Sequence, residues 1–197
     1  MKRFWKGALA VAGLGLVGGI FIWSRNRAAP RDLELAEQAA KAGLKGRLVE
    51  ARQAFVKATK RTANFRVMSL AFEFYFRTGD LTTAEQMMER WLAISSRDAE
   101  SADTAAAYGN LALIYQTQGE LDRAEEMHKK SLAIAEKLGS QEGMATQYAN
   151  LGLVAKQRGN LAGARELWTK ARDLYAKIGM PHMIKQVQGW LDALPKE

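Results

Sequence analysis

Apolar residues recur at helical spacing along most of the chain, but their pattern changes near residue 30. From Gly7 to Trp23 the sequence GALAVAGLGLVGGIFIW contains no charged residue. Beyond Pro30, apolar and charged positions alternate in runs of about eleven residues that end at a glycine. One such run has apolar residues at Tyr108, Leu111, Ala112 and Tyr115, before Gly119. This spacing of three and four residues predicts paired amphipathic helices after one N-terminal apolar helix.

The apolar run is long enough to cross a lipid bilayer when it is extended to Phe4. Residues 4–23 form about 30 Å of helix at about 1.5 Å per residue. Basic residues flank the run, and aromatic residues at both of its ends are typical of membrane interfaces. A cleaved signal peptide is the alternative, but the run ends in FIWSRNR rather than in small residues. We therefore expect residues 1–31 to form a tail and a single uncleaved transmembrane anchor.

The contacts and the orientation of this anchor are less constrained by the sequence. Gly15 and Gly19 form a GxxxG pair, which favours helix–helix contact in a membrane, although a glycine-rich span has the same appearance. Counting basic residues on both flanks favours a cytoplasmic body. The dense positive charge of the six-residue tail resembles a signal sequence and favours the opposite orientation. We prefer the second interpretation, which predicts a single-pass protein of a bacterial inner membrane with its body on the periplasmic side.

The body contains internal repeats. The segment YGNLALIYQTQGELDRAEEMHKKS from Tyr108 returns 40 residues later as YANLGLVAKQRGNLAGARELWTKA from Tyr148. MSLAFEFYFRTGDLTTAEQMMERW from Met68 is an earlier copy, and LAEQAAKAGLKGRLVEARQAFVKA from Leu35 is a fourth copy at shorter spacing. In each copy a glycine permits the left-handed backbone that ends a helix, and small residues let two helices approach. Because one such hairpin cannot bury its apolar stripe alone, the copies must stack.

These residues resemble the tetratricopeptide repeat (TPR), in the 40-residue variety of kinesin light chains and cell-polarity adaptors. The resemblance implies an all-α fold, a right-handed α-solenoid of TPR helical hairpins, in addition to the N-terminal transmembrane helix. We expect the TPR domain at 32–197, with a first copy that packs loosely or forms a membrane-proximal cap. The expected repeats lie at about 32–64, 65–98, 105–138 and 145–178, followed by a capping helix at 181–194.

The resemblance also implies a concave groove, lined by the first helix of each repeat, in which protein partners lie as extended peptides or helices. The expected groove residues are Glu73, Phe76, Arg77, Asn110, Leu113, Gln116, Thr117, Asn150, Leu153, Lys156, Gln157, Gln186 and Trp190. An asparagine amide can pair with both polar groups of a peptide backbone. Asn110 and Asn150 therefore form either a ladder along an extended partner or two braces to adjacent helices. Basic residues of a chaperone-type carboxylate clamp are replaced by Ala106, Gly109 and Thr146, so we do not expect such a clamp.

The distribution of charge narrows the function further. The net charge is +8, but residues 1–31 hold six basic residues and no acid, which leaves 23 basic and 21 acidic residues beyond them. The excess charge therefore flanks the apolar run and indicates membrane anchoring rather than nucleic-acid binding. The basic run Lys57, Lys60, Arg61 and Arg66 is either a contact to anionic lipid headgroups or a solvated helix face.

We expect neither a catalytic site nor a metal site. The chain has no cysteine, and the spacing of His128 and His182 matches no zinc motif. Acidic pairs such as Glu125 and Glu126 have no nearby nucleophile, base or phosphate-binding loop in the sequence. We therefore predict a protein that is not an enzyme and uses no cofactor, metal or small-molecule substrate. The predicted function is a membrane-anchored scaffold or adaptor for a protein partner in a membrane complex; the alternative is an envelope chaperone or assembly factor for transient clients.

Overall fold

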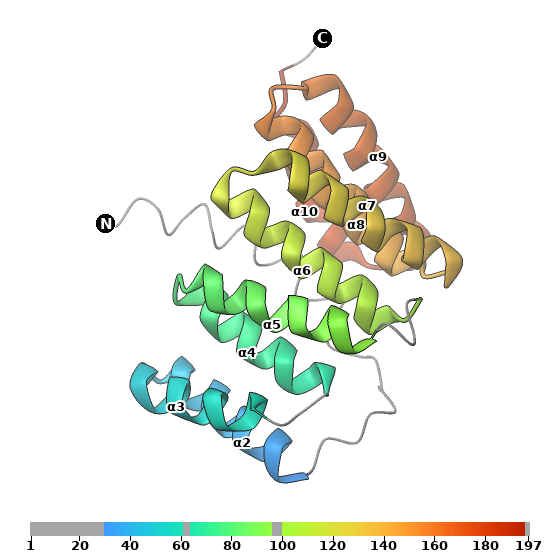
Figure 1. The fold of residues 1–197 in the computed structure, drawn as a ribbon. Coiled ribbons are helices and arrows are strands. Elements are labelled where there is room, and N and C mark those ends of the chain that lie inside the picture. The colour runs from blue at the N-terminus through green and yellow to red at the C-terminus, as the bar shows by residue number, and fades with distance from the viewer. Residues whose placement is uncertain (1–29, 61–63, 96–99, 196–197) are drawn as a thin grey trace. The chain divides into compact units, whose positions relative to one another are not determined.

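The computed structural model describes residues 30–60, 64–95 and 100–195, and all secondary structure within them is helical (Figure 1). Two compact units are present, and each is described by itself: the N-terminal unit contains α2 to α5 and the C-terminal unit contains α6 to α10. The N-terminal unit consists of α2 (Pro30–Leu44), α3 (Leu48–Thr59), α4 (Phe65–Arg77) and α5 (Leu81–Ile94). The C-terminal unit consists of α6 (Ala102–Gln118), α7 (Leu121–Lys137), α8 (Gln141–Gln157), α9 (Leu161–Lys177) and α10 (Pro181–Asp192).

Consecutive helices pack in pairs, as the repeats predict. The pairs α2–α3, α4–α5, α6–α7 and α8–α9 each make close contacts, and α10 packs on α9. The prediction of an all-helical arrangement of TPR-like hairpins is confirmed.

Side-chain caps determine where several of these helices begin. The Ser101 hydroxyl accepts a hydrogen bond from the Thr104 backbone N–H, and the Ser140 hydroxyl accepts one from the Gly143 N–H, both at 3.1 Å. Such caps satisfy N–H groups of the first turn that have no partner within the helix. As a result, α6 begins three residues and α8 four residues before the starts expected for the third and fourth repeats.

The turn inside each hairpin depends on glycine. Gly119 ends α6 with φ +82°, and the next N–H, that of Glu120, donates to the Tyr115 carbonyl at 2.8 Å. Left-handed backbone of this kind carries a steric penalty for residues with a Cβ atom. The equivalent glycines of the other copies, Gly46, Gly79 and Gly159, also have positive φ, so the predicted role of these residues is confirmed.

One large buried side chain lies nine residues after each turn glycine. The residues at this position are Phe55, Met88, His128 and Trp168, and all four are fully buried. In the α8–α9 hairpin, Trp168 packs directly on Gly152, where an added Cβ would lie 2.4 Å from the indole ring. The indole N–H donates to the Ala149 carbonyl at 3.0 Å. The prediction that small residues allow close approach of paired helices is confirmed at this position.

No helix between residues 30 and 195, within the described ranges, is long and apolar enough to cross a membrane. The anchor predicted from the sequence, with Gly15 and Gly19, falls in residues 1–29 and so lies outside the described residues.

Candidate partner-binding surface

The groove residues expected from the repeat register are distributed over both units. Glu73, Phe76 and Arg77 lie on α4 of the N-terminal unit. The remaining candidates lie on α6, α8 and α10 of the C-terminal unit, which are the helices equivalent to α4 in their own repeats. These two sets are therefore considered separately.

On α4 the charged candidates neutralise each other. The Arg77 guanidinium donates to the Glu73 carboxylate at 3.1 Å, one helical turn away. The partly exposed Phe76 ring stacks on the buried Phe72 ring with 5.5 Å between centroids. These α4 candidates consequently offer a partner the partly exposed Phe76 ring and the Glu73–Arg77 ion pair, and they carry no net charge.

On α6 the candidates are much less accessible than the groove prediction suggests. All eight residues from Gly109 to Gln116 are buried, and Asn110, Leu113 and Gln116 are each less than a tenth exposed. Thr117 is exposed, but its hydroxyl donates to the Leu113 carbonyl at 2.8 Å. Helical periodicity predicts that these residues share one face of α6, but it does not predict how far other helices bury that face.

Two amides of this surface are buried without complete hydrogen bonding. Neither polar atom of the Gln116 amide has a hydrogen-bond partner among the described residues, and the same is true of Asn150 Oδ1. A buried amide that is left unpaired costs about 1–3 kcal/mol, so such atoms are uncommon in folded proteins. The side-chain oxygen of Asn150 therefore does not form the hydrogen bond to an adjacent helix that was one of the two predicted roles of this residue.

The accessible part of the surface lies around Trp168, and we call Leu153, Lys156, Trp168 and Trp190 the Trp168 cluster. Trp190 of α10 places its ring centroid 5.5 Å from that of Trp168, and Lys156 Nζ of α8 lies 6.0 Å from the same ring. Leu153 packs against the same core and stays partly exposed. The structure thus brings together candidates from α8 and α10, with Gln157 exposed beside Lys156.

A buried polar pair inside the C-terminal unit was missed by sequence reasoning, which considered His128 only as a metal ligand. His128 Nδ1 lies 2.8 Å from Gln147 Oε1, an arrangement in which the ring nitrogen donates to the amide oxygen. Complete burial lowers the pKa of His128 to about 4, although the Gln147 hydrogen bond acts in the opposite direction. The imidazole is therefore neutral at pH 7. The repeat register could have revealed this, because His128 aligns with Trp168.

A second missed contact joins Thr146 of α8 to Tyr175 of α9. Their hydroxyl oxygens lie 3.1 Å apart in the core, and burial raises the pKa of Tyr175 to about 12. Thr146 was predicted as a residue that replaces a clamp cation. Its hydroxyl also donates to the Glu142 carbonyl at 2.9 Å, so it contributes to core packing.

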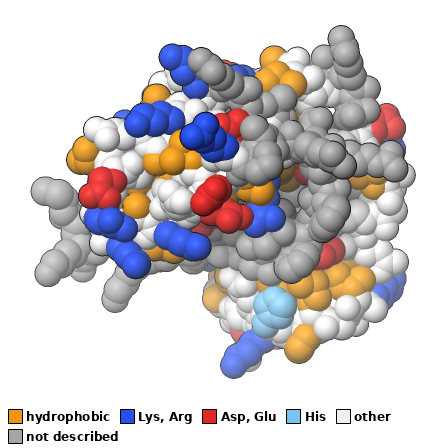
Figure 2. Space-filling model, turned by 90° about the horizontal axis from the view of Figure 1, so that it is seen from below, with side chains coloured by type: hydrophobic (Ala, Val, Ile, Leu, Met, Phe, Trp, Pro, Cys, Tyr) orange, Lys and Arg blue, Asp and Glu red, His pale blue; other side chains and the backbone are white. Residues whose placement is uncertain are grey.

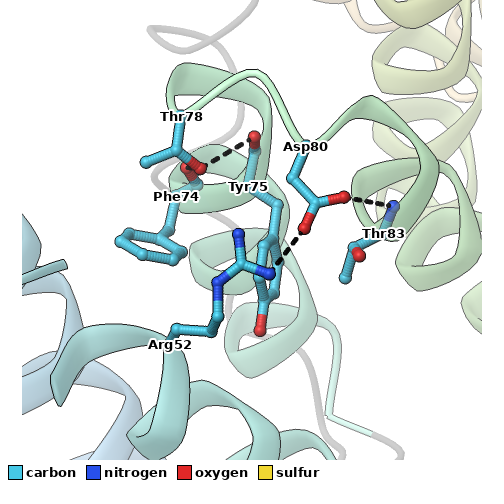
Figure 3. A network of polar contacts seen from close by, with 6 residues as sticks. All are labelled: Arg52, Phe74, Tyr75, Thr78, Asp80 and Thr83. Carbon is cyan, nitrogen blue, oxygen red and sulfur yellow. Dashed lines mark hydrogen bonds and ion pairs between the residues drawn. The ribbon is translucent and has the colours of Figure 1, made fainter. Parts of the chain in front are cut away.

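In the N-terminal unit, a polar network ties α3 to the start of α5 (Figure 3). Asp80 caps α5 by accepting from the Thr83 N–H at 3.2 Å, and it pairs with the Arg52 guanidinium at 2.9 Å. Partial burial tends to raise the pKa of Asp80, but the Thr83 and Arg52 hydrogen bonds outweigh it and hold the pKa below its ordinary value. This network positions helices and contains no reactive group.

Acidic and histidine side chains form no group that could hold a metal ion within the described parts of the chain. Those parts consist of helix-packing contacts and solvent-facing ion pairs, and nothing in them indicates catalysis.

Comparisons with known proteins agree with this arrangement. Two family models, both described as tetratricopeptide repeat, match residues 71–137 and 144–178. No curated protein sequence matches the chain.

Several solved structures share the fold at low sequence identity. A crystal structure of kinesin light chain TPR-like repeats from Podosopora anserina is 19% identical, with a TM-score of 0.61, and covers 80% of this chain and 86% of that one. BtubC from P. vanneervenii is 16% identical, with a TM-score of 0.63 and coverage of 100% and 95%. MamA is 22% identical, with a TM-score of 0.59 and coverage of 77% and 83%. From the two family matches we conclude that the chain carries tetratricopeptide repeats, and its fold is similar to that of the kinesin light chain TPR-like repeats.

Proposed function

We propose that this protein is a membrane-anchored scaffold that binds a protein partner along α6, α8 and α10 and recruits or stabilises a membrane complex. The observation that carries the proposal is the combination of unpaired amides and exposed cluster residues on equivalent helices. Gln116 and Asn150 contribute the unpaired amide atoms, and the exposed Lys156 with the partly exposed Leu153 and Trp190 contributes the accessible contacts.

The chemistry of this surface favours an extended polypeptide as the partner. Amide side chains can pair with both the N–H and the C=O of a peptide backbone. The Asn110–Asn150 ladder would therefore bind backbone groups of the partner and would not select for its side chains. Because Asn150 is almost fully buried, the partner would have to displace neighbouring side chains to reach it. An unpaired carbonyl oxygen favours that exchange, since the partner supplies a missing donor.

The Trp168 cluster would add side-chain selectivity. Leu153 and the exposed part of Trp190 offer an apolar contact, and Lys156 forms no ion pair with any described residue. An apolar residue followed by an acidic one therefore suits this end of the surface. Aromatic and cationic side chains in such positions commonly dominate binding energy.

The apolar run at residues 4–23 supports membrane attachment. Its length, flanking bases and terminal aromatic residues fit a single span, and Gly15 with Gly19 offers a face for a second transmembrane helix. We place the body on the periplasmic side of a bacterial inner membrane. Protease added to spheroplasts should then degrade the body; full protection would contradict this orientation.

Affinity purification from the native membrane in mild detergent tests the scaffold function. The full-length protein is compared with a Lys156→Glu/Gln157→Ala variant, which changes two exposed residues of α8, and with Lys177→Glu, an exposed position on α9. One stoichiometric partner that is lost only in the α8 variant supports the proposal. Retention of that partner by the α8 variant contradicts the assigned surface. Many substoichiometric clients would instead indicate the chaperone alternative.

A further inference from the structure

The α2–α3 hairpin carries a concentration of positive charge that the rest of the body does not share. Residues 30–60 hold seven basic and four acidic residues, a net charge of +3, and six of the seven basic residues lie between positions 41 and 60 with only one acid. From residue 100 to the end, by contrast, twelve basic residues are balanced by twelve acidic ones. The small excess charge of the body is therefore concentrated in its first hairpin.

The lysines of this hairpin differ in their contacts from four of the lysines of the C-terminal unit. Lys41, Lys45, Lys57 and Lys60 are exposed, and none of them forms an ion pair with a residue that the structure describes. In the C-terminal unit, Lys129, Lys130, Lys137 and Lys170 each pair with a glutamate. The hairpin thus leaves these four lysines available to an external anion, although Arg47 and Arg52 are paired with Glu50 and Asp80.

Aliphatic side chains are exposed among these lysines. Val49 and Val56 are 72% and 56% exposed and lie seven residues apart on α3, so they share one solvent-facing side of the helix, away from the buried Phe55. Leu44 at the end of α2 and Leu48 at the start of α3 are 74% and 49% exposed. Single exposed aliphatic residues are ordinary, whereas this one hairpin exposes four of them. Figure 2, viewed from the end at which Figure 1 draws this hairpin, shows Lys and Arg side chains next to hydrophobic ones.

An open hollow lies between the start of α2 and the end of α3. Its volume is about 470 Å³, and Arg31, Lys57 and Lys60 contribute positive charge to a lining that also contains Asp32 and Glu34. Three cations against two acids around one hollow favour a ligand with an anionic group and polar oxygens. A phospholipid headgroup has this chemistry.

The sequence places this surface close to the proposed anchor. Six residues separate Trp23, at the end of the apolar run, from Pro30, the first residue of α2. The seven Cα–Cα steps from Trp23 to Pro30 span at most about 25 Å. If residues 4–23 cross a bilayer, the first hairpin is held within that distance of its surface.

From these observations we infer that the α2–α3 hairpin docks on the surface of a bilayer that contains anionic phospholipid, with Val49 and Val56 facing the headgroup region and Lys57 and Lys60 contacting phosphates. The inference rests on the proposed membrane anchor. Interleaved aliphatic and basic side chains are typical of helices that lie in a membrane interface. A second copy of this chain fits the same face less well, because two hairpins of net charge +3 repel each other.

This membrane contact extends the function of the protein. An anchor alone does not specify which face of the N-terminal unit lies against the membrane, whereas a docked hairpin does. The local content of anionic lipid then sets the fraction of molecules in the docked orientation. Each lysine near an anionic surface changes such a preference about fivefold, so Lys57 and Lys60 together account for about 25-fold.

The absence of cysteine allows a direct test with one introduced thiol. Val56→Cys in the full-length protein is labelled with an environment-sensitive fluorophore and reconstituted into vesicles of phosphatidylcholine, with or without an equal part of phosphatidylglycerol. We expect a blue shift of emission in the anionic vesicles alone. A Lys57→Gln/Lys60→Gln change should abolish most of that shift, whereas Lys129→Gln/Lys130→Gln, which removes two paired lysines of α7, should preserve it.

Two controls separate this inference from the anchor. A label at Lys177→Cys on α9 should remain aqueous in both vesicle types, and flotation with phosphatidylcholine vesicles reports the anchor itself. Flotation without a lipid-dependent shift at Val56 overturns the docking inference and leaves the anchor intact. A shift that follows protein concentration rather than lipid composition also overturns docking and assigns the face to a second copy. Loss of flotation with a retained shift in anionic vesicles contradicts the anchor instead.

Discussion

The α8–α9 and α2–α3 hairpins are built on the same frame but differ in their cores and surfaces. Both turn at a glycine with positive φ, and both bury a large aromatic residue nine positions later, Trp168 in one and Phe55 in the other. Seven residues before the turn, α8 has Gly152 and α2 has Ala39. The indole of Trp168 occupies the space that Gly152 leaves, whereas α2 carries a methyl group at the equivalent position.

The surfaces of the two units differ more strongly than their backbones. In the C-terminal unit Arg158, the residue that follows α8, forms ion pairs with Asp122 and Glu125 of α7, and these pairs join neighbouring repeats. In the first hairpin the lysines and four aliphatic residues face outward. The positions shared by all repeats therefore determine how helices pair, while the positions that differ between repeats decide what each hairpin contacts. The following predictions test this separation, beginning with the largest effect.

His128 should make the C-terminal unit sensitive to acid in a way that the N-terminal unit is not. The equivalent residue of α5 is Met88, which does not titrate. Because burial lowers the folded pKa of His128 from 6.5 to about 4, the unfolded chain binds a proton that the folded chain excludes between these values. Stability should therefore fall as pH decreases from about 6.5 to about 4, by about 3 kcal/mol in total.

Urea unfolding at several pH values, read by hydrogen exchange in α7, measures this effect. His128→Met should remove the pH dependence, at the cost of leaving Gln147 without its partner. His182→Gln, at an exposed position of α10, serves as the control and should leave the dependence intact. An unchanged pH dependence in His128→Met would show that another group is responsible.

Gly152→Ala should destabilise the α8–α9 hairpin, although α2 has an alanine, Ala39, at the equivalent position. The new methyl group would lie 2.4 Å from the Trp168 ring, which is held by its hydrogen bond to Ala149. Overpacking of this kind costs about 1–3 kcal/mol. Thermal unfolding of the full-length protein gives the loss. Gly189→Ala on α10 meets nothing within 4 Å and should be neutral or gain up to about 1 kcal/mol; equal losses in both variants would refute the steric explanation.

Asp80→Ala should weaken the N-terminal unit by about 1 kcal/mol, because it removes the cap of α5 and the partner of Arg52. The pKa of Asp80 lies below its ordinary value of 3.8, so this contribution is present above pH 3.8 and is lost as pH falls through the lower folded value. Chemical denaturation at pH 7 and at acid pH measures both effects. Glu120→Ala is the matched control, since Glu120 precedes α7 without a side-chain cap and should have little effect.

Arg158→Gln should have the smallest effect, a loss of at most about 1 kcal/mol, since Arg158 and its two carboxylate partners are substantially exposed. Raising the salt concentration should shrink the difference between the variant and the original protein. Paired urea titrations at low and high salt give the comparison. A larger loss that salt does not change would indicate that Arg158 contributes to packing rather than to charge pairing.

Most of the fold could be predicted because it depends on local signals that repeat. Tyr108 and Tyr148 open equivalent segments, and Gly119 and Gly159 end equivalent helices, so one recurring pattern specified helix pairs over the whole body. The starts of α6 and α8 were less predictable, because Ser101 and Ser140 cap them outside the repeated segment. The candidate site was predicted as a register of residues, but their accessibility was not.

The sequence by itself determined the repeat, the glycine turns, the small residues between paired helices and the separation of a basic, apolar N-terminal segment from a nearly neutral body. These features follow from spacing and composition, which are properties of the chain. Only the tertiary structure decided that Asn150 and Gln116 are buried, that His128 pairs with Gln147, and that Lys57 and Lys60 stay unpaired. Burial and pairing depend on side chains distant in the sequence, and helical periodicity indicates a face without showing what covers it.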